Sequence, residues 1–201
     1  MARQGNYIIG GTIKMKIAKC KLKGIGAYSQ CRYHNTEKEP KELSCDYEKR
    51  TWREKAHVNK DNNVIIPPMV FANCIKEAAT YLSIAIPGQG KSKYTKHFQS
   101  GIIVTDPLVL PITKDDLVPE WVLVPSDGRR GGTTRVEKCF PIIQEWEGTV
   151  AFYIFDDIIT LDIFETVLRE AGNIIGIGRF RPKNWGYYGR FKVQSIEWGG
   201  K

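Results

Sequence analysis

The sequence predicts an α+β fold with a ferredoxin-like (RRM-like) βαββαβ core, a long insertion after the first strand and a basic β-hairpin. Apolar and charged residues alternate over 12–33, as expected of a strand with one buried face. Apolar residues recur at helical spacing over 68–86 and 160–171, which predicts two amphipathic helices. β-branched and aromatic residues over 149–155 and 190–198 predict two more strands. With one further strand, the elements follow the ferredoxin-like order.

The first strand is expected to have one apolar and one cationic face. Ile13, Met15 and Ile17 alternate with lysines, and the alternation continues from Ala18 after a slip of one residue. The slip predicts a β-bulge or a bend between Ile17 and Ala18. Lysine protects solvated edge strands, and in a basic chain it also binds phosphates, so the cationic face fits either role.

The helices have recognisable ends. Prolines at 67–68 are expected to open the first helix, which should end near Ile86. A loop over 89–99 and a strand over 101–105 follow. In the second helix Thr160 is the expected N-cap and Gly172 the C′ glycine. Right-handed crossovers place both helices on one face of the sheet and leave the other face for a ligand or partner.

Two stretches fall outside the core pattern. Residues 35–65 are polar and of mixed charge, and a segment of this length between a strand and a helix predicts an insertion. Residues 121–140 predict two hairpin arms around a glycine-rich tip that carries Arg129 and Arg130. We expect a single domain spanning 1–201, with both stretches as additions to it.

The charge balance favours a polyanionic partner. The formal net charge is +8 and the pI is near 9.2, and nucleic acid is the commonest polyanion that such a protein binds. No apolar run is long enough for a membrane span, and no apolar leader precedes the first strand. Five cysteines without paired spacing suit a reducing compartment. We therefore expect a cytoplasmic protein with no membrane partner.

The stretch 171–193 combines residue types that suit nucleic acid. Its glycines allow close approach to another polymer, its arginines bind phosphates, and its aromatic side chains accept stacked bases. An alternative is a glycine-kinked β-hairpin whose aromatic residues belong to the core. Composition does not separate the two interpretations.

Two motifs resemble the RAMP superfamily. Gly176-Ile177-Gly178, followed by Gly186 and Gly189-Arg190-Phe191, is similar to the C-terminal glycine-rich loop of that family. Ile66-Pro67-Pro68 before a helix resembles a second segment of the same group. The family comprises ferredoxin-like, RNA-binding subunits of CRISPR effector complexes. The resemblance implies RNA as partner, head-to-tail assembly along a guide RNA, and a thumb at 35–65 that touches the guide–target duplex or the neighbouring subunit.

The candidate nucleic-acid-binding residues are cations and aromatic residues of the first strand, the insertion and the basic loops. They are Lys14, Lys16, Lys19, Lys21, Lys23, Arg53, Lys91, Lys93, Arg129, Arg130, Arg179, Arg181, Lys183, Trp185, Tyr187 and Arg190. We expect the loop at 179–183 to overhang the helix-free face of the sheet, and the loop at 129–130 to extend the same sheet and close over a strand laid there. No catalytic residue, no metal and no cofactor is expected.

Three other motifs have a simpler account. Residues 85–92 fit a relaxed P-loop pattern, but helical spacing precedes them where a P-loop needs a strand, so a basic loop is favoured. Cys31-x-x-His34, with Cys45 and His57 further on, offers four zinc-ligand types, but Cys45 and His57 are isolated rather than paired, so free cysteines and a surface histidine are favoured. The Asp156-Asp157 pair suits the N-terminus of the following helix.

These observations favour a non-catalytic protein that binds RNA or single-stranded nucleic acid through its backbone, as a homo-oligomer or as a subunit of a larger ribonucleoprotein. Two alternatives stay open. One is a viral or accessory protein of the same fold that acts by protein contact. The other is an endoribonuclease, for which Asp46 or Asp61 in the insertion would be available although no motif singles out either. An NTPase is not expected.

Overall fold

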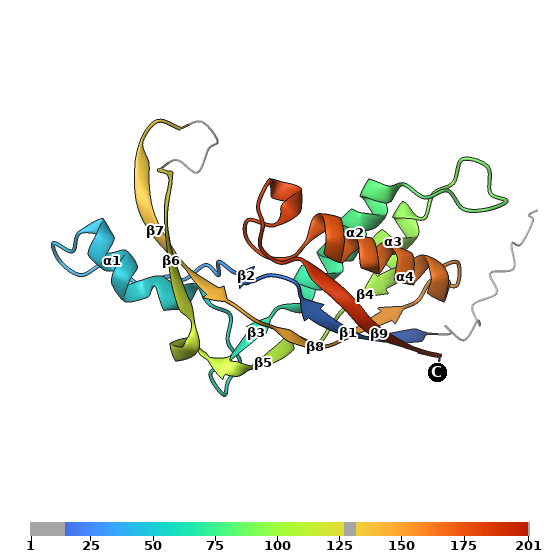
Figure 1. Cartoon of the computed structure of the whole chain (residues 1–201), viewed down its shortest axis with the longest axis horizontal. Helices are drawn as coiled ribbons and strands as arrows, with labels where there is room; N and C mark the ends of the chain where they lie inside the picture. The colour runs from blue at the N-terminus through green and yellow to red at the C-terminus, as the bar shows by residue number, and fades with distance from the viewer. Residues whose placement is uncertain (1–14, 127–131, 201) are drawn as a thin grey trace, which may run out of the picture.

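The computed structural model describes residues 15–126 and 132–200 (Figure 1). Its centre is a four-stranded antiparallel sheet in the order β4-β8-β1-β9. The strands are β1 (Lys16–Gly24), β4 (Ile102–Ile103), β8 (Glu147–Ile154) and β9 (Phe191–Gly200). The helices α2 (Pro68–Leu82) and α4 (Leu161–Glu170) lie on one side of this sheet. The order of strands and helices is ferredoxin-like, so the predicted fold class is confirmed.

The central strand β1 buries one face, as its sequence predicts. Ala18, Cys20 and Leu22 are fully buried, and Phe71 and Phe164 of the two helices belong to the same core. The predicted bulge between Ile17 and Ala18 is wrong, because both residues pair continuously with β8 and β9. The irregularity lies at Lys21/Leu22, where the pairing with β9 skips one residue of β9.

The segment after α2 differs from its prediction. The helix ends at Leu82 rather than near Ile86, because Ser83 adopts the left-handed conformation with φ 50°. The second half of the predicted loop forms the short helix α3 (Thr95–Gly101), which buries Phe98. The strand β4 that follows is only Ile102–Ile103. A single buried aromatic residue in a short polar helix leaves no periodic pattern in the sequence.

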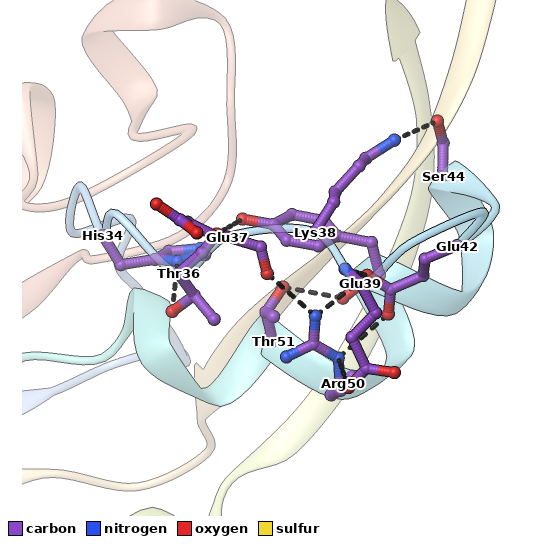
Figure 2. Close-up of polar contacts among 10 residues, drawn as sticks. His34, Thr36, Glu37, Lys38, Glu39, Glu42, Ser44, Arg50 and Thr51 are labelled. Carbon is purple, nitrogen blue, oxygen red and sulfur yellow. Dashed lines mark hydrogen bonds and ion pairs between the residues drawn. The ribbon is translucent and has the colours of Figure 1, made fainter.

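The insertion is packed against the rest of the fold. It contains α1 (Ser44–Thr51), the 3₁₀ turn η1 (Trp52–Lys55) and β3 (Asn63–Ile66), which pairs with β5 (Leu108–Thr113). Figure 2 shows Arg50 at the centre of the polar contacts within it: its Nε donates to Glu42 Oε1 at 2.9 Å and its Nη2 to Glu42 Oε2 at 2.9 Å.

A buried ion pair holds the insertion to the hairpin. Lys55 Nζ donates to Glu48 Oε2 at 2.5 Å and to the carbonyl of Cys139 at 2.8 Å, and Lys138 also contacts Glu48. Glu48 is 2% exposed, and burial alone would raise its pKa. The hydrogen bonds from Lys138, Lys55 and the Cys139 amide outweigh burial and lower the pKa.

The predicted hairpin is present and longer than expected. Its arms are β6 (Val118–Pro125), which follows the 3₁₀ turn η2 (Lys114–Asp116), and β7 (Arg135–Ile143). The strand β2 (Tyr28–Ser29) pairs with the other edge of β7. The expected basic tip, with Arg129 and Arg130, lies outside the described residues.

The chain leaves α4 through a π-helical turn, η3 (Ala171–Ile175), and makes one more 3₁₀ turn, η4 (Pro182–Asn184), before β9. Gly172 lies inside the π-helical turn η3 and is therefore not the predicted C′ glycine. A Cβ on Gly172 would be 2.1 Å from the carbonyl oxygen of Phe191, so close packing against β9 requires glycine there. None of the helices in the described part of the chain has both the length and the apolar character that crossing a membrane requires.

Candidate nucleic-acid interface

Residues 176–190, the glycine-rich loop, fold tightly on themselves. The Ile177 amide donates to the Gly189 carbonyl at 2.9 Å, and the Gly189 amide donates to the Ala27 carbonyl at 2.8 Å. A Cβ on Gly189, whose φ is +75°, would be 1.9 Å from the carbonyl oxygen of Ile177. A Cβ on Gly186 would be 1.7 Å from the Phe180 carbonyl oxygen. These glycines are required by the packing of the loop itself, and close approach of a second polymer is not needed to explain them.

Three cations of this loop, Arg179, Arg181 and Lys183, are paired with carboxylates. Arg181 Nη2 lies 2.8 Å from Glu77 Oε1 of α2, and Lys183 Nζ lies 2.5 Å from Glu77 Oε2. Burial alone would raise the pKa of Glu77, but hydrogen bonds from Lys183 and Arg181 outweigh it and hold the pKa below its usual value. Arg179 pairs with Glu120 of β6. The partners Glu77 and Glu120 had no signal in the sequence.

These ion pairs also place the loop. Because Arg181 and Lys183 bind α2, the glycine-rich loop lies against the helix layer, between α2 and the hairpin (Figure 1). The expectation that residues 179–183 overhang the helix-free face of the sheet is therefore wrong. Packing places the loop next to α2, and the ion pairs with Glu77 then hold it there.

The loop presents aromatic side chains to solvent. Trp185 is 83% exposed, Tyr187 61% and Phe180 46%. The rings of Phe180 and Tyr187 make an edge-to-face contact with their centroids 5.6 Å apart. Tyr188 is buried instead, and its hydroxyl donates to Glu120. The interpretation of these aromatic residues as core therefore holds for Tyr188 and fails for the other three.

Two of the exposed aromatic residues adopt an unfavourable backbone conformation. Trp185 has φ +63° and Phe180 has φ +53°, in the left-handed region that a bulky side chain rarely occupies. The turn around Trp185 is closed by hydrogen bonds from the Trp185 amide to Pro182 at 2.9 Å and from the Gly186 amide to Arg181 at 3.0 Å. Such strain costs about 1–3 kcal/mol and is concentrated at functional sites.

A shallow groove separates the glycine-rich loop from the hairpin. It is lined by Val122, Leu123 and Val124 of β6, by Phe180 and Tyr187 of the loop, and by Glu120 and Arg179. The Arg179 guanidinium lies over the Phe140 ring, 3.8 Å from its centroid, and Lys55 lies 4.7 Å from the same centroid. The aromatic and apolar walls of the groove suit the bases of a single strand, and Arg179 is the cation among its described lining residues.

The lysines of β1 form a separate surface. Lys19, Lys21 and Lys23 are exposed on the helix-free face of the sheet, where Lys192 of β9 lies opposite Lys23. Lys16 does not belong to this face. It shares the alternation of the buried residues, and its Nζ donates to the Asp157 carbonyl at 3.2 Å and lies 3.1 Å from Asp157 Oδ1. Lys14 lies outside the described residues.

The remaining candidates are dispersed. The guanidinium of Arg53 lies over the Trp52 ring, 4.3 Å from its centroid. Lys91 and Lys93 are exposed on the loop between α2 and α3, and Arg190 is exposed at the start of β9. The predicted residues that the structure describes thus fall on the glycine-rich loop, the helix-free sheet face and the α2–α3 loop, apart from Arg53 in the insertion and Lys16 beside Asp157.

The other motifs do not assemble into sites. In the described part of the chain, no three His, Cys, Asp or Glu side chains are placed to hold a metal ion. Figure 2 shows His34 directed at Thr36, whose hydroxyl lies 3.2 Å from His34 Nδ1. Residues 85–93 form a loop closed by the Ala85–Lys93 bridge, without the preceding strand of a P-loop. Asp156 does not serve the helix N-terminus: it accepts from the Ile158 amide at 3.0 Å and contacts His97.

The fold is similar to that of known CRISPR effector chains. A chain of a Type III-B Cmr-beta complex bound to cognate target RNA aligns with a TM-score of 0.51 and 14% identity, over 92% of this chain and 61% of that one. This chain therefore spans less than two thirds of that protein. Cmr6 from Pyrococcus furiosus aligns with a TM-score of 0.49 and 12% identity, over 90% of this chain and 100% of that one. A chain of a CRISPR RNA-guided surveillance complex aligns with a TM-score of 0.37 and 8% identity, over 90% of this chain and 67% of that one.

No family model and no curated protein matches the sequence. The likeness to the Cmr-beta chain, together with the strand order, confirms the ferredoxin-like fold that the resemblance implied.

Proposed function

We propose that this protein binds single-stranded RNA without cleaving it, as a cytoplasmic subunit of a larger ribonucleoprotein. The strand would lie across the glycine-rich loop and the groove beside β6. The observation that carries the proposal is Trp185: a large aromatic side chain, 83% exposed, held in a strained backbone conformation by a closed turn. A protein gains nothing in stability from this arrangement, so a ligand that stacks on the indole is the simplest reason for it.

The surroundings of Trp185 support the same ligand. Phe180 and Tyr187 provide further exposed faces, and Arg179, Arg181 and Lys183 lie within the same loop. In its fold the chain resembles a subunit of a Cmr-beta complex that was solved with cognate target RNA. Stacking and backbone contacts do not distinguish base edges, so binding is expected to show little dependence on sequence.

The test is a titration of the protein with single-stranded RNA and DNA of equal length at two salt concentrations, comparing the unmodified chain with Trp185→Gly. Glycine relieves the left-handed strain, so the free energy of unfolding should stay the same or rise by up to about 1 kcal/mol. Affinity for RNA should fall by about 1–3 kcal/mol, with an unchanged slope against salt because stacking releases no counterion.

A matched control is Phe155→Ala, which removes an exposed aromatic side chain after β8, next to α3. It should leave RNA affinity unchanged. Equal losses in the two variants, or a Trp185→Gly variant that binds RNA normally, would refute the stacking role. RNA recovered from the titration should keep its full length; shortened products would favour the endoribonuclease alternative.

A second candidate function, binding to another protein, is favoured by the hairpin. Trp121 is 42% exposed on the face of β6 opposite to the one that carries Glu120 and Val122, and Leu123, which also lines the groove, is 63% exposed. The cations of the glycine-rich loop are also paired internally rather than free. If the protein shows no salt-dependent binding to either kind of strand, this candidate takes the place of RNA binding.

A further inference from the structure

A second cationic site lies on α3 and the loop before it, away from the glycine-rich loop. Lys91, Ser92, Lys93, Thr95, Lys96 and His97 line a pocket of ≈ 500 Å³, which we call the lysine pocket. Figure 1 shows the α2–α3 loop projecting at the end of the molecule opposite to the β6–β7 hairpin. A single strand stacked in the groove beside β6 therefore does not need this pocket.

The lysines of this pocket differ from the cations of the glycine-rich loop in their partners. Among the described residues, no carboxylate lies within ion-pair distance of Lys91, Lys93 or Lys96. All three are exposed. Three like charges around one pocket repel one another, and an anion within the pocket removes that repulsion.

The frame that carries these lysines is fixed. The Ile86 amide donates to the Ser92 carbonyl at 2.8 Å, and the Tyr94 amide donates to the Ile84 carbonyl at 3.0 Å, which closes the loop. Phe98 is fully buried and anchors α3 in the core. Thr95 Oγ1 donates to the Ala79 carbonyl at 3.3 Å. The lysine stems therefore start from defined backbone positions.

His97 is held in place by a carboxylate behind it. Its Nδ1 lies 2.6 Å from Asp156 Oδ2, while Asp156 Oδ1 accepts from the Ile158 amide at 3.0 Å. Asp156 packs directly on Gly101, where a Cβ would be 2.6 Å from the Asp156 Cβ. The contact with Asp156 uses Nδ1 and fixes the ring, which leaves Nε2 as the nitrogen available to a ligand.

The lining determines which part of a ligand fits. Besides the lysines and His97, it consists of hydroxyl and amide side chains, and none of the described residues that line it is Phe, Tyr, Trp or aliphatic. Nothing there stacks on a nucleobase or binds an apolar group. The pocket is also larger than a single phosphate group and lies in the size range of small-ligand sites.

We propose that the lysine pocket binds a chain of phosphate groups, either a free polyphosphate or the 5′-phosphate end of an RNA. Lys91, Lys93 and Lys96 supply the charge, and the hydroxyl of Ser92 supplies a further hydrogen-bond donor. This site is independent of stacking on Trp185.

The test is calorimetric titration of the full chain with inorganic tripolyphosphate at low ionic strength. The unmodified protein should bind one equivalent saturably, and Lys91→Ala/Lys93→Ala should bind at least about tenfold more weakly. Lys41→Ala/Lys60→Ala is the control, because it removes the same charge from two exposed lysines of the insertion. Unchanged thermal melting would show that each variant is folded.

Three RNAs of one sequence, with a 5′-triphosphate, a 5′-monophosphate or a 5′-hydroxyl, distinguish the sources of phosphate. A preference for the phosphorylated ends that Lys91→Ala/Lys93→Ala abolishes identifies an RNA end as the ligand. Equal binding of the three RNAs, together with saturable tripolyphosphate binding, identifies a free polyphosphate. The proposal is overturned if tripolyphosphate does not bind saturably, or if the control variant loses as much affinity as Lys91→Ala/Lys93→Ala.

Discussion

Glu77 offers a perturbation that separates the stability of the glycine-rich loop from its affinity for RNA. Its carboxylate pairs with Arg181 at 2.8 Å and with Lys183 at 2.5 Å. Glu77→Gln keeps the shape of the side chain and removes the charge, so both cations lose their anionic partner while the loop sequence stays intact. Stability and RNA affinity should then change in opposite directions.

The size of the expected stability loss follows from the exposed fractions of the three paired side chains. The side chains of Glu77 and Arg181 are 26% and 17% exposed, and Lys183 is 46% exposed, so these ion pairs are only partly shielded from solvent. Losing the pairs should lower the free energy of unfolding by about 1–2 kcal/mol. For a domain of this size, that corresponds to a decrease in Tm of about 2–8 °C.

For RNA the same change should be favourable. Two cations without a carboxylate can displace two more counterions, so the slope of log affinity against log salt should steepen by about 1.4. Affinity at low salt should rise by about three- to tenfold, because a nearby repulsive charge has been removed. Fluorescence anisotropy with a labelled single-stranded RNA at several salt concentrations measures both quantities.

The control for this prediction is Glu165→Gln. Glu165 pairs with Arg169 at 2.6 Å on α4, so its substitution also frees an arginine and raises the formal net charge from +8 to +9. Equal gains in RNA affinity for the two variants would mean that net charge alone acts. In that case the inference that Arg181 and Lys183 face the RNA would be wrong.

Three further predictions concern stability and reactivity. Gly189→Ala should destabilise the fold by more than about 2 kcal/mol in urea unfolding, because its Cβ would be 1.9 Å from the Ile177 carbonyl oxygen and its φ is +75°. The pKa of Glu48 is lower in the folded protein than in the unfolded chain, so the unfolded chain binds a proton at this carboxylate more tightly. The ionised Glu48 therefore stabilises the fold above pH 4.5, and this stabilisation is lost as the pH falls below 4.5. Glu48→Gln should remove that part of the pH dependence of the urea midpoint. Burial, and secondarily the charge of Glu165, raises the pKa of Cys20 to about 12. A thiol reagent should therefore label the exposed Cys31 in the folded protein and Cys20 only after unfolding, as measured by mass spectrometry. Rapid labelling of Cys20 in the native state would contradict its burial.

Much of the core could be predicted from periodicity. Apolar residues at every second position of β1 and β8, and at helical spacing in α2 and α4, identify which side of each element is buried. The order of those elements along the chain then leaves few topologies for the sheet, and the ferredoxin-like one is observed. Short elements without a repeating pattern, such as α3, are invisible to this reasoning.

The exposed face of β1 shows both the success and the limit of that reasoning. Its alternation correctly places Lys19, Lys21 and Lys23 together on one face, because side chains of a strand point to opposite sides in turn. Lys16 follows the same alternation to the opposite face, because the expected bulge between Ile17 and Ala18 is absent, and its Nζ lies 3.1 Å from Asp157 Oδ1. A cation that looks like part of a row in the sequence is thus a link between two elements.

The glycine-rich loop was located by sequence, since glycines, cations and aromatic residues are concentrated there, but the state of its charges was decided by the tertiary structure. Arg181 meets Glu77 across 104 positions of the sequence, and Arg179 meets Glu120 across 59. Sequence periodicity indicates which face of its own helix or strand a residue lies on. An ion pair depends instead on the distance between two elements, and packing has to set that distance before the Coulomb interaction can form the pair. Composition therefore indicated which stretch to propose as the binding surface for a polyanion, and the packing of α2 and β6 against the loop decided which cations already have a partner.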